Sequence, residues 1–200
     1  MSARKSVAAI AALALTAGAA AADMPQSFGI LEFGPDNTLF VADSAGGAIH
    51  AYELPAGGDA PEQDAAFNLL DVDQLVTETL DATGRVVYSD LVVHPVTREA
   101  FVSATTTVDG VETGAIVAIS RDGSARTLDL DTYPSSKFML QDTADAGVTF
   151  WRDIPAPSLT VTDLDYANGE LFVSGVSTGE FASTLRRVPF PFDYIVRANV

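Results

Sequence analysis

The chain has 200 residues and a formal net charge of −16 at pH 7, because 27 aspartates and glutamates outweigh 11 lysines and arginines. This acidity argues against nucleic acid and anionic lipid as partners, since both repel a negative surface and attract a positive one. The hydrophobic fraction of 48% fits a packed globular domain, and the absence of cysteine excludes a disulfide framework.

The first 22 residues have the pattern of a secretory signal peptide. Arg4 and Lys5 precede a short apolar stretch from Val7 to about Ala17, and Ala20-Ala-Ala22 fits an A-x-A cleavage site. No other stretch approaches the ~18 uninterrupted apolar residues that a membrane-spanning helix needs. We therefore expect residues 1–22 to be removed and the mature chain to be periplasmic or secreted, with no membrane span.

A hairpin pattern follows, in which an apolar run, a tight turn and a second apolar run succeed one another. Gly29–Phe33 and Thr38–Asp43 are the two runs, and Ala48–Tyr52 predicts a third strand. Pro35-Asp-Asn37 suits the turn between the runs, because Asn and Asp tolerate the left-handed backbone conformation. This first repeat covers residues from about 28 to 70.

One short helix is predicted near residues 72–80, as an insertion between the first and second repeats. Asp71 is suited to cap its beginning and Gly84 to end it. The residues that share one face at helical spacing are Val72, Leu75, Val76, Thr79 and Leu80.

The hairpin pattern recurs twice more, over about 86–131 and 158–192. The second repeat predicts four strands, at Asp90–His94, Ala100–Ala104, Ala115–Ser120 and Ala125–Leu130. The third predicts three, at Val161–Tyr166, Glu170–Gly175 and near Thr184–Val188. The segment Thr132–Pro157 between these two repeats is expected to be an irregular insertion.

Four consecutive antiparallel strands with tight turns are typical of one blade of a β-propeller. The sequence therefore predicts an all-β fold over residues 23–200, a partial propeller of about three four-stranded blades with the short helix inserted. A closed propeller has ~4–8 blades, so the ring is expected to be incomplete. The chain would then be a fragment, a truncated product, or one part of an assembly with another copy.

Two segments resemble secreted β-propellers of the NHL, YVTN and gluconolactonase-like superfamily. They are Phe33-Gly-Pro-Asp-Asn-Thr-Leu-Phe-Val-Ala-Asp43 and Gly46-Gly-Ala-Ile-His-Ala-Tyr52. A third, Phe181–Phe192, resembles a segment of longer exported bacterial members of that group. The resemblance implies the propeller fold, but it carries no activity over, because unrelated functions share such folds.

Asp90 and Asp163 occupy equivalent positions, at the starts of the first strands of the second and third repeats. The first strands of propeller blades line a central axis, so the two carboxylates would approach one another there. Carboxylate oxygens suit Ca²⁺ or another hard divalent cation. The alternative is that each aspartate caps the turn that enters its strand. The first repeat has Phe28-Gly29 at this position, which weakens the case for a metal.

The sequence favours an exported scaffold that binds a small molecule or a protein partner, with or without a structural divalent cation. The alternative is a metal-dependent lactonase or esterase of the gluconolactonase type, with Asp90 and Asp163 as two of several metal ligands.

No catalytic set stands out in the sequence. Gly175–Gly179 fits the G-x-S-x-G pattern, but both histidines precede Ser177, so a turn is the favoured interpretation. His94 ends a strand and is interpreted as a hydrogen-bonded structural residue or as a channel ligand. His50 is expected to point outward.

Overall fold

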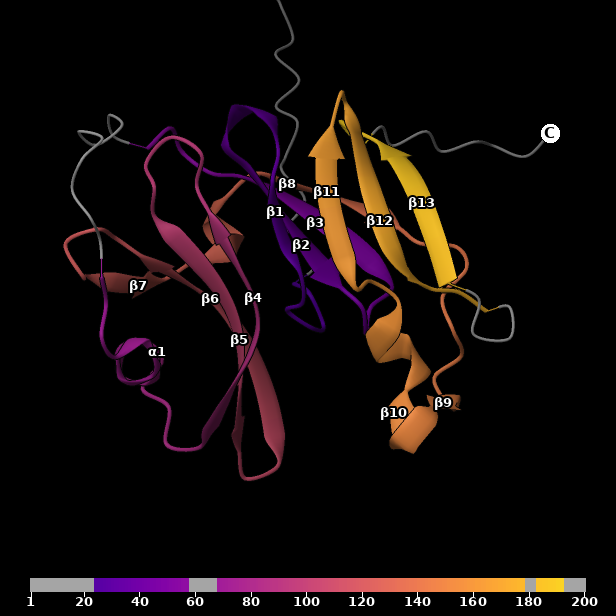
Figure 1. Ribbon diagram of the computed structural model, residues 1–200, viewed down its shortest axis with the longest axis horizontal. Coiled ribbons are helices and arrows are strands. Elements are labelled where there is room, and N and C mark those ends of the chain that lie inside the picture. Colours follow the sequence, from indigo (N-terminus) through magenta and orange to yellow (C-terminus); the bar gives the residue numbers. More distant parts are fainter. Residues whose placement is uncertain (1–23, 58–67, 179–182, 193–200) are drawn as a thin grey trace, which may run out of the picture.

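The computed structural model describes residues 24–57, 68–178 and 183–192. These residues form four antiparallel sheets and one α-helix (Figure 1). The prediction of a mostly-β fold with one short helix is therefore confirmed. The expected signal peptide, residues 1–22, lies outside the described residues. No helix in the described ranges is long and apolar enough to cross a membrane.

The first sheet has the strand order β1-β2-β3-β8. Its strands are β1 (Leu31–Phe33), β2 (Thr38–Asp43), β3 (Ala48–Glu53) and β8 (Ser135–Met139). The predicted turn is present as a short 3₁₀ element, Pro35–Asn37, in which Asp36 and Asn37 have left-handed φ angles of 52° and 61°.

The expectation of an irregular insertion over Thr132–Pro157 is wrong in part. Ser135–Met139 is β8, which pairs antiparallel with β3 and completes the first sheet. A second piece of the same segment forms a separate two-stranded sheet from β9 (Thr149–Phe150) and β10 (Ile154–Pro155). The remaining 3₁₀ elements of this region are Leu130–Thr132, Trp151–Asp153 and Ala156–Leu159.

The second sheet follows the chain order, β4-β5-β6-β7. Its strands are β4 (Arg85–Val93), β5 (Ala100–Val108), β6 (Val111–Ile119) and β7 (Ala125–Thr127). Helix α1 (Val72–Thr79) packs on this sheet through Val76, against Val102 and Val117. The predicted N-cap is confirmed, because the Asp71 carboxylate accepts a hydrogen bond from the Gln74 N–H at 3.0 Å.

The third sheet has three strands within the described residues, as the pattern of the third repeat predicts. They are β11 (Asp163–Ala167), β12 (Glu170–Val176) and β13 (Ser183–Pro189), paired in that order.

The first sheet lies between the second and third sheets, so its two faces contribute to two different cores. Leu39 and Val41 of β2 pack toward the second sheet with Phe101. Phe40 and Ala42 of β2 pack toward the third sheet among residues such as Val173. Because successive strand residues point to opposite faces, burial on both sides leaves every residue of β2 buried.

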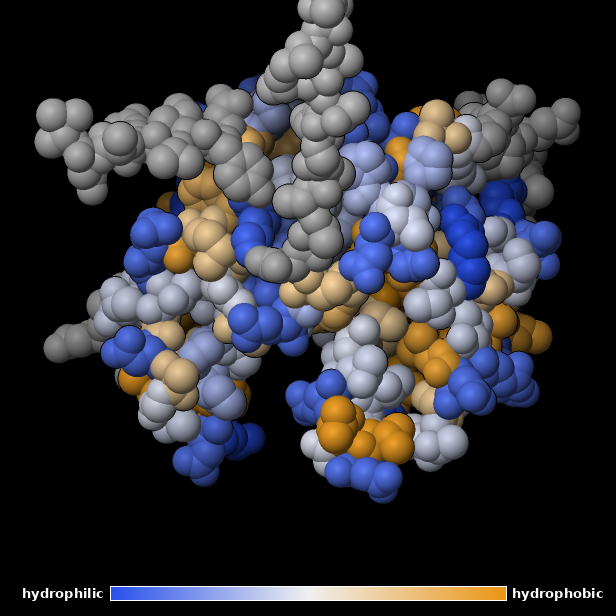
Figure 2. All heavy atoms as spheres, turned by 180° about the vertical axis from the view of Figure 1, so that it is seen from behind, coloured by the Kyte–Doolittle hydropathy of each residue, from blue (hydrophilic) through white to orange (hydrophobic). Residues whose placement is uncertain are grey.

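β1 is the edge strand of the first sheet, and it meets the first strands of the second and third sheets. β1 contacts β4 of the second sheet and β11 of the third (Figure 1). The order in space is therefore second sheet, first sheet, third sheet, which differs from the order along the chain. Hydrophilic residues cover much of the face seen from behind, and apolar residues show in several smaller patches, one of them on a projecting lobe (Figure 2).

Candidate functional site

Asp90 joins two of the converging strands. A register shift in the pairing of β4 with β5 lies between Tyr88 and Asp90. The Asp90 carboxylate accepts a hydrogen bond from the Leu31 N–H at 2.8 Å through one oxygen and from the Leu91 N–H at 2.8 Å through the other. The side chain thus satisfies a backbone donor on the edge of β1 that does not pair with β2. This structural role differs from the turn cap considered above.

Asp163 begins β11, the strand on the other side of β1. It lies opposite Ser174 in the register of β11 and β12, and it is exposed. The sequence placed Asp90 and Asp163 on first strands, and the structure places these two strands on either side of β1.

Glu32 of β1 lies between them and was missed by sequence reasoning. Burial raises the pKa of Glu32 above its ordinary value, and the negative charges of Asp165, Asp90 and Asp163 raise it further. These four carboxylates, from three sheets, form what we call the inner-edge acidic strip. Within the described residues, no group of three or more His, Cys, Asp or Glu side chains is placed to hold a metal ion.

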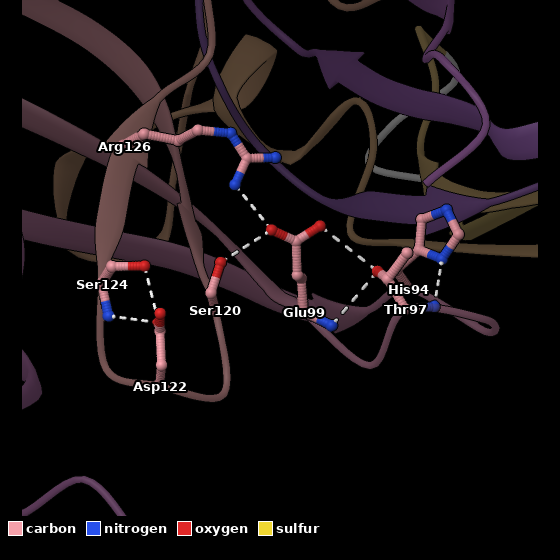
Figure 3. Close-up of polar contacts among 7 residues, drawn as sticks. All are labelled: His94, Thr97, Glu99, Ser120, Asp122, Ser124 and Arg126. Atoms are coloured by element: carbon pink, nitrogen blue, oxygen red, sulfur yellow. Dashed lines mark hydrogen bonds and ion pairs between the residues drawn. The ribbon is translucent and has the colours of Figure 1, made fainter. Parts of the chain in front are cut away.

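His94 is fixed by the backbone that follows it (Figure 3). Its Nδ1 accepts hydrogen bonds from the N–H groups of Val96 and Thr97, both at 3.1 Å. The proton of the neutral ring is therefore on Nε2. Burial lowers the pKa of His94, against an opposing effect of the Glu99 charge. Its ring also packs edge-on against Phe33, with 4.7 Å between centroids. This geometry favours the structural interpretation of His94.

Glu99 is the centre of the polar network beside His94 (Figure 3). Its carboxylate accepts hydrogen bonds from Arg126 at 2.6 Å, from the Ser120 hydroxyl at 2.9 Å and from the Thr97 hydroxyl at 3.2 Å. Burial alone would raise the pKa of Glu99, but these donors and the Arg126 charge lower it overall.

His94, Glu99 and Arg126 line a cavity of about 100 Å³ with Phe101 and Tyr133. That volume is below the ~300–1,000 Å³ typical of small-molecule sites. Because the Glu99 carboxylate is already paired with three donors, we interpret the network as support for the end of the second sheet.

His50 is buried, so the expectation that it points outward is wrong. Only 3% of its surface is exposed, and its Nε2 lies 3.6 Å from an oxygen of the buried Asp43. The two residues are not opposite one another in the pairing of β2 and β3, where His50 faces Val41 and Asp43 faces Ala48. The first sheet is buried on both faces, so side chains of β3 such as His50, which would point to solvent in a half-exposed strand, are buried as well.

The G-x-S-x-G segment supplies no catalytic arrangement within the described part of the chain. Ser177 follows β12 of the third sheet, whereas His50 is in β3 of the first sheet and His94 follows β4 of the second. Gly179 lies outside the described residues.

Comparisons with protein-family models, with curated proteins and with solved structures find no match to this chain.

Proposed function

We propose that the chain is part of an exported β-propeller-type scaffold, which binds a cationic ligand or a basic partner at the inner-edge acidic strip. The observation that carries the proposal is the contact of β1 with both β4 and β11. It brings first strands of three face-to-face sheets to one edge, which is where propeller blades meet. Binding is favoured over catalysis because the strip is a charged surface and, among the described residues, no serine hydroxyl is hydrogen-bonded to a histidine.

The sign of the partner's charge follows from Glu32. Its raised pKa reflects burial together with the negative charges of Asp165, Asp90 and Asp163. A bound cation would lower the electrostatic energy of all four carboxylates. A divalent cation such as Ca²⁺ and the lysines of a basic protein both have the required charge.

The test is a calorimetric titration of the full chain with Ca²⁺ and, separately, with oligolysine. We expect one of the two to bind the wild-type chain and to raise its melting temperature. Glu32→Gln should weaken that binding, because it removes the central charge of the strip. Glu112→Gln, an exposed glutamate on β6, is the matched control and should bind as the wild type does.

The two probes distinguish the two kinds of partner. Binding of Ca²⁺ alone would support a structural cation, and binding of oligolysine alone would support a basic protein partner. The proposal fails if neither probe binds, or if Glu32→Gln and Glu112→Gln weaken binding equally.

A further inference from the structure

A second cleft lies at the seam between the first and third sheets and shares no lining residue with the His94 cavity. Its volume is about 400 Å³, which is within the ~300–1,000 Å³ range of small-molecule sites. The lining residues are Pro35, Asp36, Thr38, Glu53, Tyr166, Phe190 and Pro191.

Two aromatic rings form a corner of this cleft. The centroids of Tyr166 and Phe190 are 6.3 Å apart and their planes are 88° from parallel. Phe40, which is fully buried, stacks on Tyr166 at 5.8 Å and meets Phe190 edge-on at 4.9 Å. Core packing therefore supports both rings from behind, so the corner does not depend on a ligand for its shape.

Two carboxylates lie beside this aromatic corner. Asp36 is in the turn between β1 and β2, and Glu53 ends β3 opposite Thr38. Both residues are exposed, and the described residues that line the cleft include no lysine, arginine or histidine. This described lining therefore combines aromatic surfaces with negative charge and has no positive group.

We propose that this cleft binds a small quaternary ammonium compound of the choline type. A quaternary ammonium ion is attracted to the faces of aromatic rings, and proteins recognise such ions with several aromatic rings placed around them. The Asp36 and Glu53 carboxylates attract the positive charge of the ligand at long range, without direct contact. A metal ion would fit less well, because the lining has only two carboxylates, and no three or more acidic, histidine or cysteine side chains of the described residues are grouped to hold one. This proposal does not depend on the inner-edge acidic strip.

The experiment compares choline with dimethylbutanol, a neutral analogue in which carbon replaces the ammonium nitrogen. Both are titrated calorimetrically into the full chain. Since the two molecules have nearly the same shape, their difference reports the charge. We expect choline to bind about 2- to 30-fold more tightly, the range that cation–aromatic attraction provides.

Two substitutions assign the binding to this cleft. Tyr166→Leu should reduce choline affinity by a similar factor and leave dimethylbutanol almost unaffected. Tyr88→Leu, on the second sheet, is its control. Glu53→Gln should weaken choline binding and reduce its dependence on ionic strength, with Glu112→Gln as the control. Glu53 is exposed, so this variant should fold even where Tyr166→Leu does not, and circular dichroism checks both.

The proposal is overturned if the folded wild-type chain does not bind choline, or binds dimethylbutanol equally well. It is also overturned if Glu53→Gln leaves choline binding unchanged. The Ca²⁺ titration of Glu32→Gln tests the acidic strip independently, so the failure of one site leaves the other interpretable.

Discussion

Asp43 provides the sharpest test of how the first sheet is stabilised. Its carboxylate accepts hydrogen bonds from the N–H groups of Gln26, Ser27 and Gly46, at 2.8, 2.9 and 2.8 Å. The His50 ring lies 3.6 Å away. A Cβ on Gly46 would lie 2.2 Å from the carboxylate, so glycine is needed for this close approach. Asp43 thus joins the segment before β1 to the turn after β2.

The contribution of Asp43 to the free energy of unfolding follows from the pKa of its carboxyl group. Burial alone would raise it, but the nearby His50 ring and the hydrogen bonds from Gln26, Gly46 and Ser27 lower it from 3.8 to about 2. At about 1.4 kcal/mol for each pH unit, the folded state gains ~2 kcal/mol from ionised Asp43. Because the folded-state pKa is the lower one, this stabilisation is complete above about pH 4. It is lost as the pH falls through 2.

We therefore expect Asp43→Asn to lower the free energy of unfolding by at least about 2 kcal/mol at pH 7. The difference from the wild type should shrink by about the same amount between pH 5 and pH 2. Urea unfolding followed by circular dichroism measures both. Tryptophan emission is less suitable, because the single tryptophan, Trp151, is 66% exposed in the folded chain.

Asp122→Asn is the control for this experiment. The Asp122 carboxylate also accepts turn hydrogen bonds, from the N–H and hydroxyl of Ser124, but it is exposed. We expect the free energy of unfolding of Asp122→Asn to differ little from that of the wild type at any pH. A pH-independent effect of Asp43→Asn, or equal effects of both variants, would refute the reasoning.

Three further predictions concern the helix, His94 and catalysis. Asp71→Ala should destabilise the chain by about 1 kcal/mol, because the helix loses its N-cap. Val76→Ala should destabilise it by about 1–2 kcal/mol, because a cavity is left under α1. Both predictions are wrong if urea unfolding shows no difference between either variant and the wild type. His94→Asn keeps an acceptor near the position of Nδ1 but cannot titrate there. Because the folded-state pKa of His94 is lowered, the stability of the wild type should fall as the pH drops below about 6.5. The stability of His94→Asn should depend less on pH in this range. Identical pH profiles of the two proteins would show that His94 does not titrate as inferred. A panel of lactones and esters with Ca²⁺, Zn²⁺ or Mn²⁺ should give no turnover, whereas turnover that disappears in Asp163→Ala would favour the hydrolase instead.

The strands that could be predicted are those with local signals. The turn at Asp36 and Asn37 was predictable because few residues other than glycine adopt left-handed conformations readily. The helix was predictable from its spacing and its N-cap. β8 was not, because Ser135-Ser-Lys137 lacks an apolar run and its partner β3 is far away along the chain. Pairing between distant segments leaves no mark within either segment.

The candidate site could be predicted only in outline. Equivalent positions in two repeats placed Asp90 and Asp163 on strands that both contact β1. Glu32 was missed because Phe28-Gly29 was taken as the equivalent position in the first repeat. The Asp90 carboxylate instead reaches the N–H of Leu31, the residue next to Glu32. The position of Asp90 beside Leu31 and Glu32 depends on how the second sheet packs on the first. The sequence of a single repeat does not specify that packing.

The cleft between the first and third sheets could not be predicted from the sequence either. Each of its residues has a local explanation: Asp36 suits a left-handed turn, Glu53 ends an apolar strand, and Tyr166 lies before the turn to β12. None of these patterns indicates a ligand. The aromatic corner arises because Phe40, an even-numbered residue of β2, faces the third sheet and supports Tyr166 and Phe190 there. A shift of one residue in the register of β2 would turn Leu39 or Val41 toward that sheet, and the corner would lose its support.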